Sequence, residues 1–139
     1  MPSAVDPIPP PAPRTAAVTV RVRYNECDPM GIAHHASYPI WLEIARTELL
    51  RARGMAYREL EAAGVHFVVA RMSLRYRRAA RYDDELTVHV RVEKSAGIKI
   101  VHAYRIERAG ELLATAETTL ACVDGAGRPR GVPASLLDG

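Results

Sequence analysis

The chain has 139 residues, of which 48% are hydrophobic and 25% charged, and this length fits one globular domain that can bury about two-thirds of its unfolded-chain surface. Its formal net charge of +3 suits an anionic partner only weakly, and its two cysteines have no spacing typical of a zinc site or a disulfide framework. The sequence contains no pattern of a secretory signal and no apolar run near ~20 residues, so we expect a cytoplasmic protein without a membrane span.

Residues 1–16 are rich in proline, which cannot pair in a central strand or continue a helix, so we expect an extended tail there. Over residues 18–24 valine alternates with polar residues, and this period of two predicts a strand with one buried face. Residues 25–31 break the alternation with asparagine, aspartate, proline and glycine, which indicates a loop.

A long helix is predicted after this loop. Ser37 is expected to cap its N-terminus, Pro39 is tolerated in a first turn, and Gly54 favours its end. Between these positions apolar residues recur at helical spacing: Trp41, Ile44, Ala45, Leu49 and Ala52. A second, shorter helix is predicted over residues 56–63.

The remaining sequence alternates with a period of two and predicts strands over residues 65–76, 86–92, 98–106 and 112–123. The apolar parity changes within the first of them, which predicts a β-bulge near Ala70 and Arg71. Short connections favour antiparallel pairing, and the apolar face of the sheet needs the long helix as a cover. We therefore expect one α+β domain over residues 17–133 and a C-terminal tail over residues 134–139.

The polar residues between the first strand and the long helix carry the candidate chemistry. Asp28 precedes a helix start, where unpaired N–H groups and the helix dipole can stabilise an oxygen that becomes negative during acyl transfer. A carboxylate there can attack a thioester carbonyl or activate a water, and Gly31 lets the backbone approach a ligand closely. On spacing alone, a simple turn over residues 28–31 is the favoured interpretation.

Two segments also carry a resemblance to known families. Residues 23–55 read RYNECDPMGIAHHASYPIWLEIARTELLRARGM, and residues 74–86 read LRYRRAARYDDEL. They resemble the 4-hydroxybenzoyl-CoA thioesterase and Tol–Pal-associated acyl-CoA thioesterase families, which share a D-x-x-G loop and a helix with E-x-A-R. The resemblance implies a hotdog fold, an antiparallel five-stranded sheet wrapped around one long central helix. It also implies acyl-CoA substrates, active sites at a subunit interface of a homodimer or homotetramer, no metal and no separate cofactor.

Through this resemblance, Asp28 matches the catalytic carboxylate and Gly31 the loop glycine. His35 matches the position whose backbone N–H faces the thioester carbonyl. Tyr38 matches the tyrosine that follows, and Ser37 departs from the asparagine of many relatives. His34 is a second departure, and the two leave the preferred acyl group open.

Other positions are candidates for substrate binding. His34 stands beside the acyl pocket where relatives usually have an aromatic residue. Glu43 lies on the helix where a sister class of hotdog thioesterases places its carboxylate, and we expect it to pair with Arg46. Arg75, Arg77 and Lys99 are candidate partners for the phosphates and adenine of CoA, and a solvated charged face is the alternative interpretation of these residues.

The leading hypothesis is hydrolysis of an acyl-CoA to a free acid and CoA, with Asp28 as general base or nucleophile. Hydratases or dehydratases of the same fold have a motif similar to D-x-N-P-x-H. Here Pro-Met-Gly follows Asp28, and Ala33 stands five residues after it, so the motif does not match. A non-catalytic acyl-CoA sensor carries added DNA-binding helices, which residues 1–16 are too rich in proline to supply. The arginines of residues 71–81 come without a groove-reading helix, so no nucleic-acid partner is expected.

Overall fold

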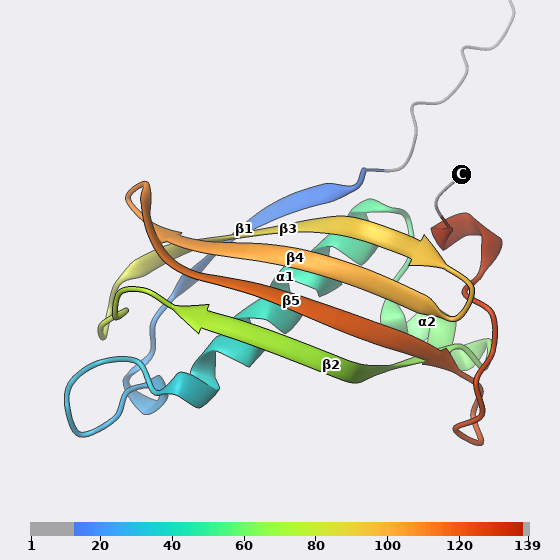
Figure 1. Ribbon diagram of the computed structural model, residues 1–139, viewed down its shortest axis with the longest axis horizontal. Coiled ribbons are helices and arrows are strands. Elements are labelled where there is room, and N and C mark those ends of the chain that lie inside the picture. Colours follow the sequence, from blue (N-terminus) through green and yellow to red (C-terminus); the bar gives the residue numbers. More distant parts are fainter. Residues whose placement is uncertain (1–12, 138–139) are drawn as a thin grey trace, which may run out of the picture.

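A computed structural model describes residues 13–137 as one curved sheet with a long helix on its concave side (Figure 1). The sheet is antiparallel, in the order β1-β3-β4-β5-β2. Its strands are β1 Thr15–Arg21, β2 His66–Tyr76, β3 Glu85–Ala96, β4 Lys99–Arg108 and β5 Glu111–Val123. The helices are η1 Tyr24–Glu26, η2 His35–Ser37, α1 Tyr38–Ala52, α2 Tyr57–Ala62 and η3 Ala134–Leu136. This architecture confirms the predicted hotdog fold.

The structure describes only part of the two predicted tails, namely residues 13–16 and 134–137. Residues 1–12 and 138–139 lie outside the described residues. β1 already begins at Thr15, and Leu136, in the predicted C-terminal tail, is buried in the core. None of the helices in the described part combines the length and the hydropathy that a membrane span requires.

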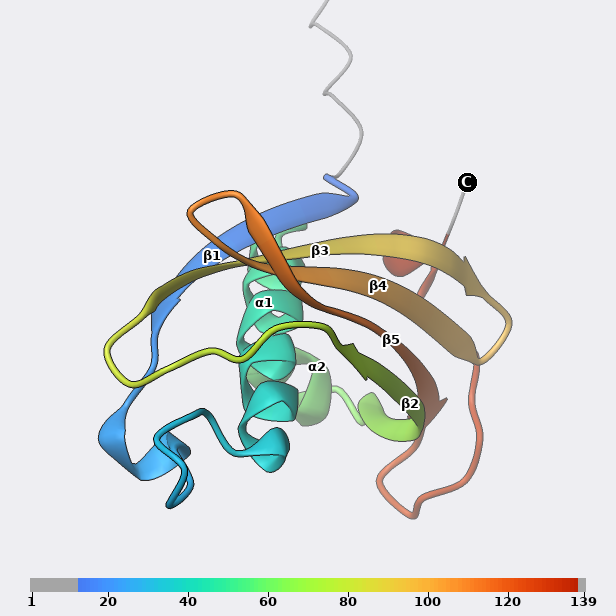
Figure 2. The same cartoon turned by 60° about the vertical axis from the view of Figure 1, so that its left-hand side comes forward.

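The core lies between α1 and the sheet that arches over it (Figure 2). The helix buries Trp41, Leu42, Ala45 and Leu49, which follow one another at the spacing of a single helical face. The prediction that Ile44 and Ala52 continue this stripe was wrong, because both lie on the flank of that face and remain exposed.

The two ends of α1 are formed by different local rules. Pro39 occupies the first turn as predicted, but the Ser37 hydroxyl does not cap the helix and donates instead to the carbonyl of Glu26, at 2.8 Å. At the other end Gly54 has φ +88° and Met55 N–H donates to the Leu50 carbonyl at 3.2 Å, as in a Schellman motif. The predicted end at Gly54 is therefore confirmed.

The strands follow the predicted alternation with two notable details. The register of β2 against β5 shifts between Val69 and Arg71, which confirms the predicted bulge at Ala70. The first strand ends at Arg21 and not at Tyr24, because the Glu26 carboxylate accepts the backbone N–H of Arg23 at 2.8 Å and turns the chain into η1.

Candidate functional site

The loop that carries Asp28 is a turn closed at several points. The carbonyl of Asp28 accepts the N–H of Gly31 at 3.0 Å, and its N–H donates to the carbonyl of Ile32 at 2.8 Å. Gly31 has φ +81°, a conformation that favours glycine. The Oδ1 atom of Asp28 accepts the N–H of Met30 at 2.8 Å, and the second carboxylate oxygen makes no hydrogen bond to the described residues.

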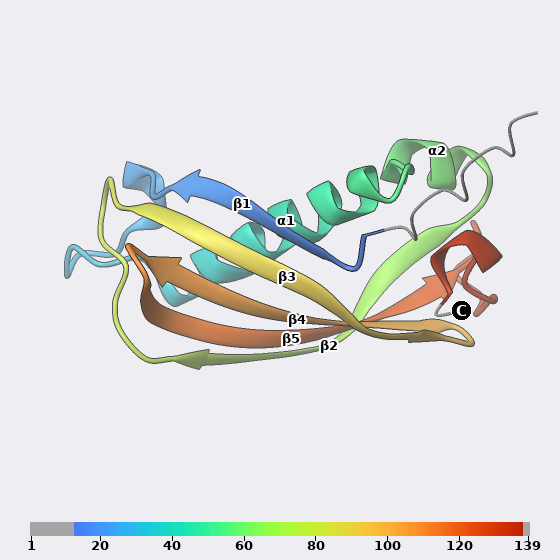
Figure 3. The same cartoon turned by 90° about the horizontal axis from the view of Figure 1, so that it is seen from above.

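Asp28 lines a cavity of about 330 Å³ together with His35, Tyr38 and Arg77. These residues come from the loop before α1, from the helix start and from the segment after β2, which all lie at one end of the sheet (Figure 3). Residues that the sequence did not single out complete the lining: Ile32, Ala33, Tyr76, Arg78 and Ala79. The cavity therefore brings a carboxylate, a helix start and two cations together.

His35, at the start of η2, lines this cavity. His34 Nδ1 accepts the N–H of Ala36 at 3.0 Å, and the N–H of His34 donates to the carbonyl of Glu26 at 2.7 Å. The N–H of His35 makes no hydrogen bond among the described residues, as is usual for the first residues of a helical turn. The rings of His34 and His35 stack with centroids 4.2 Å apart. The His35 N–H therefore stays without a partner among the described residues, on a residue that lines the cavity.

Glu26 is a buried carboxylate that fastens the loop to α1. Its Oε2 accepts the indole N–H of Trp41 at 2.9 Å, and its Oε1 accepts the N–H of Arg23 at 2.8 Å. Burial by itself raises the pKa of the Glu26 carboxyl, but these hydrogen bonds and the Arg23 guanidinium outweigh burial and hold the pKa below its ordinary value. Glu26 is one of the polar residues before the long helix, but the sequence does not reveal this contact, because Trp41 lies on another element.

Two tyrosines close one wall of the cavity. The Tyr76 hydroxyl donates to the carbonyl of His35 at 2.9 Å, and the Tyr38 hydroxyl accepts the N–H of Ala80 at 3.4 Å. Their rings meet edge to face with centroids 4.9 Å apart. Burial raises the pKa of both tyrosines, so both hydroxyls keep their protons at neutral pH.

The remaining predicted substrate residues lie elsewhere in the chain. Glu43 is exposed, lies 3.8 Å from Arg46 and lines a separate cavity of about 250 Å³, so the predicted pair with Arg46 is present. Arg75 lines a third cavity with residues of β5. Lys99 begins β4 opposite Ala121, whereas the Asp28 cavity adjoins the other end of β5, near Ala114. Within one chain, these three side chains do not meet Asp28.

Within residues 13–137, no group of three or more histidine, cysteine, aspartate or glutamate side chains is arranged to hold a metal ion. Cys27 and Cys122 are both free thiols, and Cys122 is buried.

Comparison with known proteins defines the family. A model of the thioesterase-like superfamily matches residues 22–138. The acyl-CoA thioester hydrolase YbgC of Escherichia coli O6:H1 is 38% identical over 120 residues, which cover 85% of this chain and 90% of YbgC. The acyl-CoA thioesterase YbgC of Haemophilus influenzae is 37% identical over 106 residues, covering 76% and 78% of the two chains. A DHNA-CoA thioesterase structure from Staphylococcus aureus has a TM-score of 0.82 at 28% identity, covering 84% of this chain and 80% of that one. The resemblance inferred from the motifs is confirmed, and the chain belongs to the thioesterase-like superfamily.

Proposed function

We propose that this protein hydrolyses acyl-CoA thioesters to free carboxylic acids and CoA. The observation that carries the proposal is that Asp28 and His35, whose backbone N–H has no partner among the described residues, line one cavity of about 330 Å³. A base and an oxyanion donor are the minimum that thioester hydrolysis requires, because the thiolate leaves readily. The YbgC relatives carry names of the same activity.

In the proposed reaction, a water oxygen bonds to the thioester carbonyl carbon while Asp28 takes a proton from that water. The carbonyl oxygen becomes negative and receives a hydrogen bond from the N–H of His35, whose loss typically costs about 2.7–4 kcal/mol of transition-state stabilisation. The C–S bond then breaks, and the CoA thiolate leaves and takes up the proton. A variant of this route has Asp28 attack the carbonyl itself and form an anhydride that water hydrolyses. Neither route uses a separate cofactor.

Two arginines support CoA as the leaving group. Arg77 and Arg78 both line the Asp28 cavity, and arginine suits phosphate because its planar guanidinium can donate two parallel hydrogen bonds. Their backbone N–H groups both donate to the carbonyl of Leu113, at 2.8 and 3.1 Å, so β5 fixes their place beside the cavity. We assign the CoA phosphates to these two side chains. Arg75 and Lys99 stay candidates only for a site to which a second subunit contributes.

The edge of β2 supports a homo-oligomer. β2 is an outer strand of the sheet, and Val68, Val69 and Met72 on it are exposed. An edge strand with exposed apolar residues is a template for pairing with another chain. We propose antiparallel pairing of β2 with its copy in a homodimer, which two dimers can extend to a tetramer. We also propose a cytoplasmic location, which the two free thiols support.

The test is Asp28→Asn, with thiol release measured over short, long and aromatic acyl-CoAs. We expect turnover to fall by about 10²–10⁴-fold, the usual contribution of a general base. Asp124→Asn is a matched control, because Asp124 Oδ1 accepts the N–H of Ala126 at 2.9 Å and Gly127 follows with φ +81°. This turn repeats the local geometry of the Asp28 turn away from the cavity, so its variant should keep full activity.

Full turnover in Asp28→Asn would refute the mechanism. Loss of enoyl-CoA absorbance without thiol release would favour a hydratase instead. Tight acyl-CoA binding without turnover in the unmodified protein would favour a non-catalytic sensor.

A further inference from the structure

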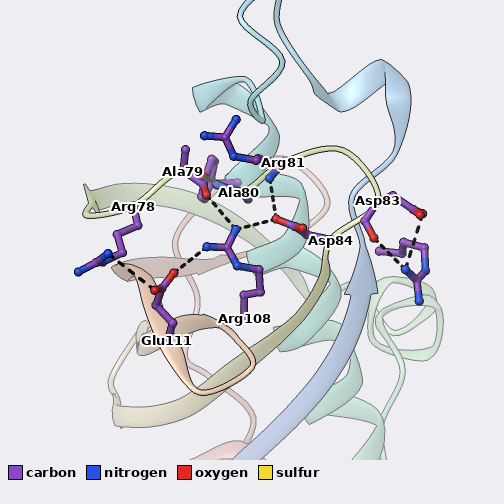
Figure 4. A network of polar contacts seen from close by, with 10 residues as sticks. Arg78, Ala79, Ala80, Arg81, Asp83, Asp84, Arg108 and Glu111 are labelled. Atoms are coloured by element: carbon purple, nitrogen blue, oxygen red, sulfur yellow. Dashed lines mark hydrogen bonds and ion pairs between the residues drawn. The ribbon is translucent and has the colours of Figure 1, made fainter.

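An ion-pair network joins the segment between β2 and β3 to the ends of β4 and β5 (Figure 4). Arg78 and Ala79 of this segment also line the Asp28 cavity. At the centre of the network, Arg108 Nη1 donates to Asp84 Oδ2 at 2.7 Å and to the carbonyl of Ala79 at 3.2 Å. Arg108 Nη2 donates to Glu111 Oε1 at 2.6 Å, and Glu111 Oε2 lies 3.7 Å from Arg78. We call Arg108, Asp84 and Glu111 the Arg108 network. It connects β4 and β5 with the segment of residues 77–84.

The turn between β4 and β5 explains why these charges meet. Ala109 and Gly110 have φ values of +48° and +83°, so the chain reverses over two residues and places Arg108 opposite Glu111. Asp84 Oδ2 also accepts the N–H of Arg81 at 2.8 Å, which closes a turn within residues 77–84. Residues 74–86 are one of the two segments that carry the family resemblance. Their Asp83-Asp84 pair thus gains a structural role, because Asp84 forms an ion pair with Arg108.

The segment held by Arg108 in turn holds the Asp28 loop. The carbonyl of Ala80 accepts the N–H of Ala33 at 2.8 Å, and Ile32 forms an antiparallel bridge with Arg81. Ile32 is the residue whose carbonyl accepts the N–H of Asp28. Hydrogen bonds joined by one-residue steps of backbone therefore connect Arg108, through residues 79–80 and 32–33, with the backbone N–H of Asp28.

The charges of the central pair are well matched. Burial raises the pKa of Asp84, but the Arg108 guanidinium and the Arg81 N–H outweigh it and lower the pKa below its ordinary value. The hydrogen bonds to Asp84 and Glu111 raise the pKa of Arg108. The side chains of Arg108 and Asp84 are 30% and 23% exposed, so this is a partly buried pair whose partners both stay ionised at neutral pH.

We propose that Arg108 and Asp84 are positioning residues for thioester hydrolysis, because their ion pair fixes residues 77–84 and, through Ile32 and Ala33, the place of Asp28. This inference rests on the proposed function. Neither side chain lines the Asp28 cavity, so both act through the backbone that they hold. Displacement of a reacting group by about 1 Å can cost about 10²-fold in rate.

The kinetic test is Arg108→Gln, compared with Arg105→Gln on the same strand. We expect kcat to fall by about 10- to 100-fold in Arg108→Gln, because Asp28 loses its fixed position. KM should change by less than about threefold, because the bonds from Arg77 and Arg78 to the carbonyl of Leu113 remain. Arg105 is 59% exposed and pairs with Glu107 at 2.9 Å, so its loss should leave kcat within about twofold.

A conservative variant and a second readout keep the proposal falsifiable. Arg108→Lys retains a charge that reaches Asp84 and should recover part of kcat, whereas a role in overall stability alone would leave kcat of folded Arg108→Gln unchanged. Peptide-level hydrogen exchange, measured well below the melting temperature, should quicken over residues 28–34 and 79–84 in Arg108→Gln but not in Arg105→Gln.

Unchanged kcat in folded Arg108→Gln, or unchanged exchange over residues 28–34, would overturn the positioning role. Loss of turnover in Asp28→Asn alongside normal Arg108→Gln would refute this inference and leave the proposed function intact. Absence of thiol release from the unmodified protein would refute the proposed function itself.

Discussion

Replacing Glu26 by glutamine measures how strongly a single buried carboxylate ties the loop before the site to α1. The two oxygens of Glu26 accept N–H groups from Arg23 and Trp41, at 2.8 and 2.9 Å. Glutamine keeps one oxygen, so its amide NH₂ must face one of these two donors. A hydrogen bond to a charged acceptor contributes about 1.5–3 kcal/mol, and the free energy of unfolding should fall by about that amount.

For a chain of this length, that loss lowers the melting temperature by roughly 5–12 °C, which thermal unfolding followed by circular dichroism can resolve. Glu48→Gln is the control, because Glu48 is 47% exposed and, among residues 13–137, pairs only with Arg51, at 3.2 Å. Its loss should cost no more than about 1 kcal/mol.

The same variant makes a prediction about pH. Glu26 has a pKa below its ordinary value of 4.5 in the folded protein, so the folded state binds fewer protons than the unfolded state as pH falls. Its contribution is therefore fully present above pH 4.5 and is lost as pH falls through the lower folded-state pKa. The stability difference between the unmodified protein and Glu26→Gln should be largest at neutral pH and shrink in acid. A difference that stays constant between pH 7 and pH 3 would refute the assignment to the carboxylate charge.

Three further predictions concern the fold and the assembly. Ala109→Asn should raise the melting temperature by about 3 °C, because asparagine tolerates the positive φ at which alanine is strained by about 1 kcal/mol; an unchanged or lower value would contradict this. Leu42→Ala should lower the free energy of unfolding by about 2–5 kcal/mol in denaturant titrations, because Leu42 is fully buried beneath the sheet, and a loss under about 1 kcal/mol would show that the core refills the space. Val69→Lys should shift the protein toward a monomer in sedimentation velocity, because it places a charge on the exposed edge strand; an unaltered oligomer would exclude pairing through β2.

Much of the fold could be predicted because burial imposes a period on the sequence. Alternation located the strands, the change of parity located the bulge at Ala70, and Gly54 located the end of α1. The early end of β1 could not be predicted, because it depends on a hydrogen bond between Glu26 and the backbone of Arg23. The local pattern indicates which face of a strand or helix a residue occupies. It does not indicate which side chain will form a hydrogen bond with the backbone and end a strand.

Less of the candidate site could be predicted from the local sequence. Asp28 and Asp124 make turns of the same kind, so the turn by itself carries no information about chemistry. The position before a helix start made Asp28 a candidate, and the family resemblance made it the favoured one. Only the structure shows which residues share its cavity. Arg108 meets Asp84 across 24 positions of sequence, and Glu26 meets Trp41 across 15. Such contacts are set by the pairing of strands and the packing of α1, which periodicity does not encode.

The bulge at Ala70 also sets which side chain the sheet offers to the cavity. Phe67 before it and Leu74 after it both pack against the core, although the number of residues between them would put them on opposite faces of a regular strand. If Ala70 paired regularly, opposite Thr119, every later residue of β2 would move by one position. Arg75 would then lie opposite Ala114, in the place of Tyr76, whose hydroxyl now holds the carbonyl of His35. Loss of the bulge would therefore be chemically equivalent to a substitution inside the cavity, so the unpaired Ala70 is as much a part of the site as the residues that line it.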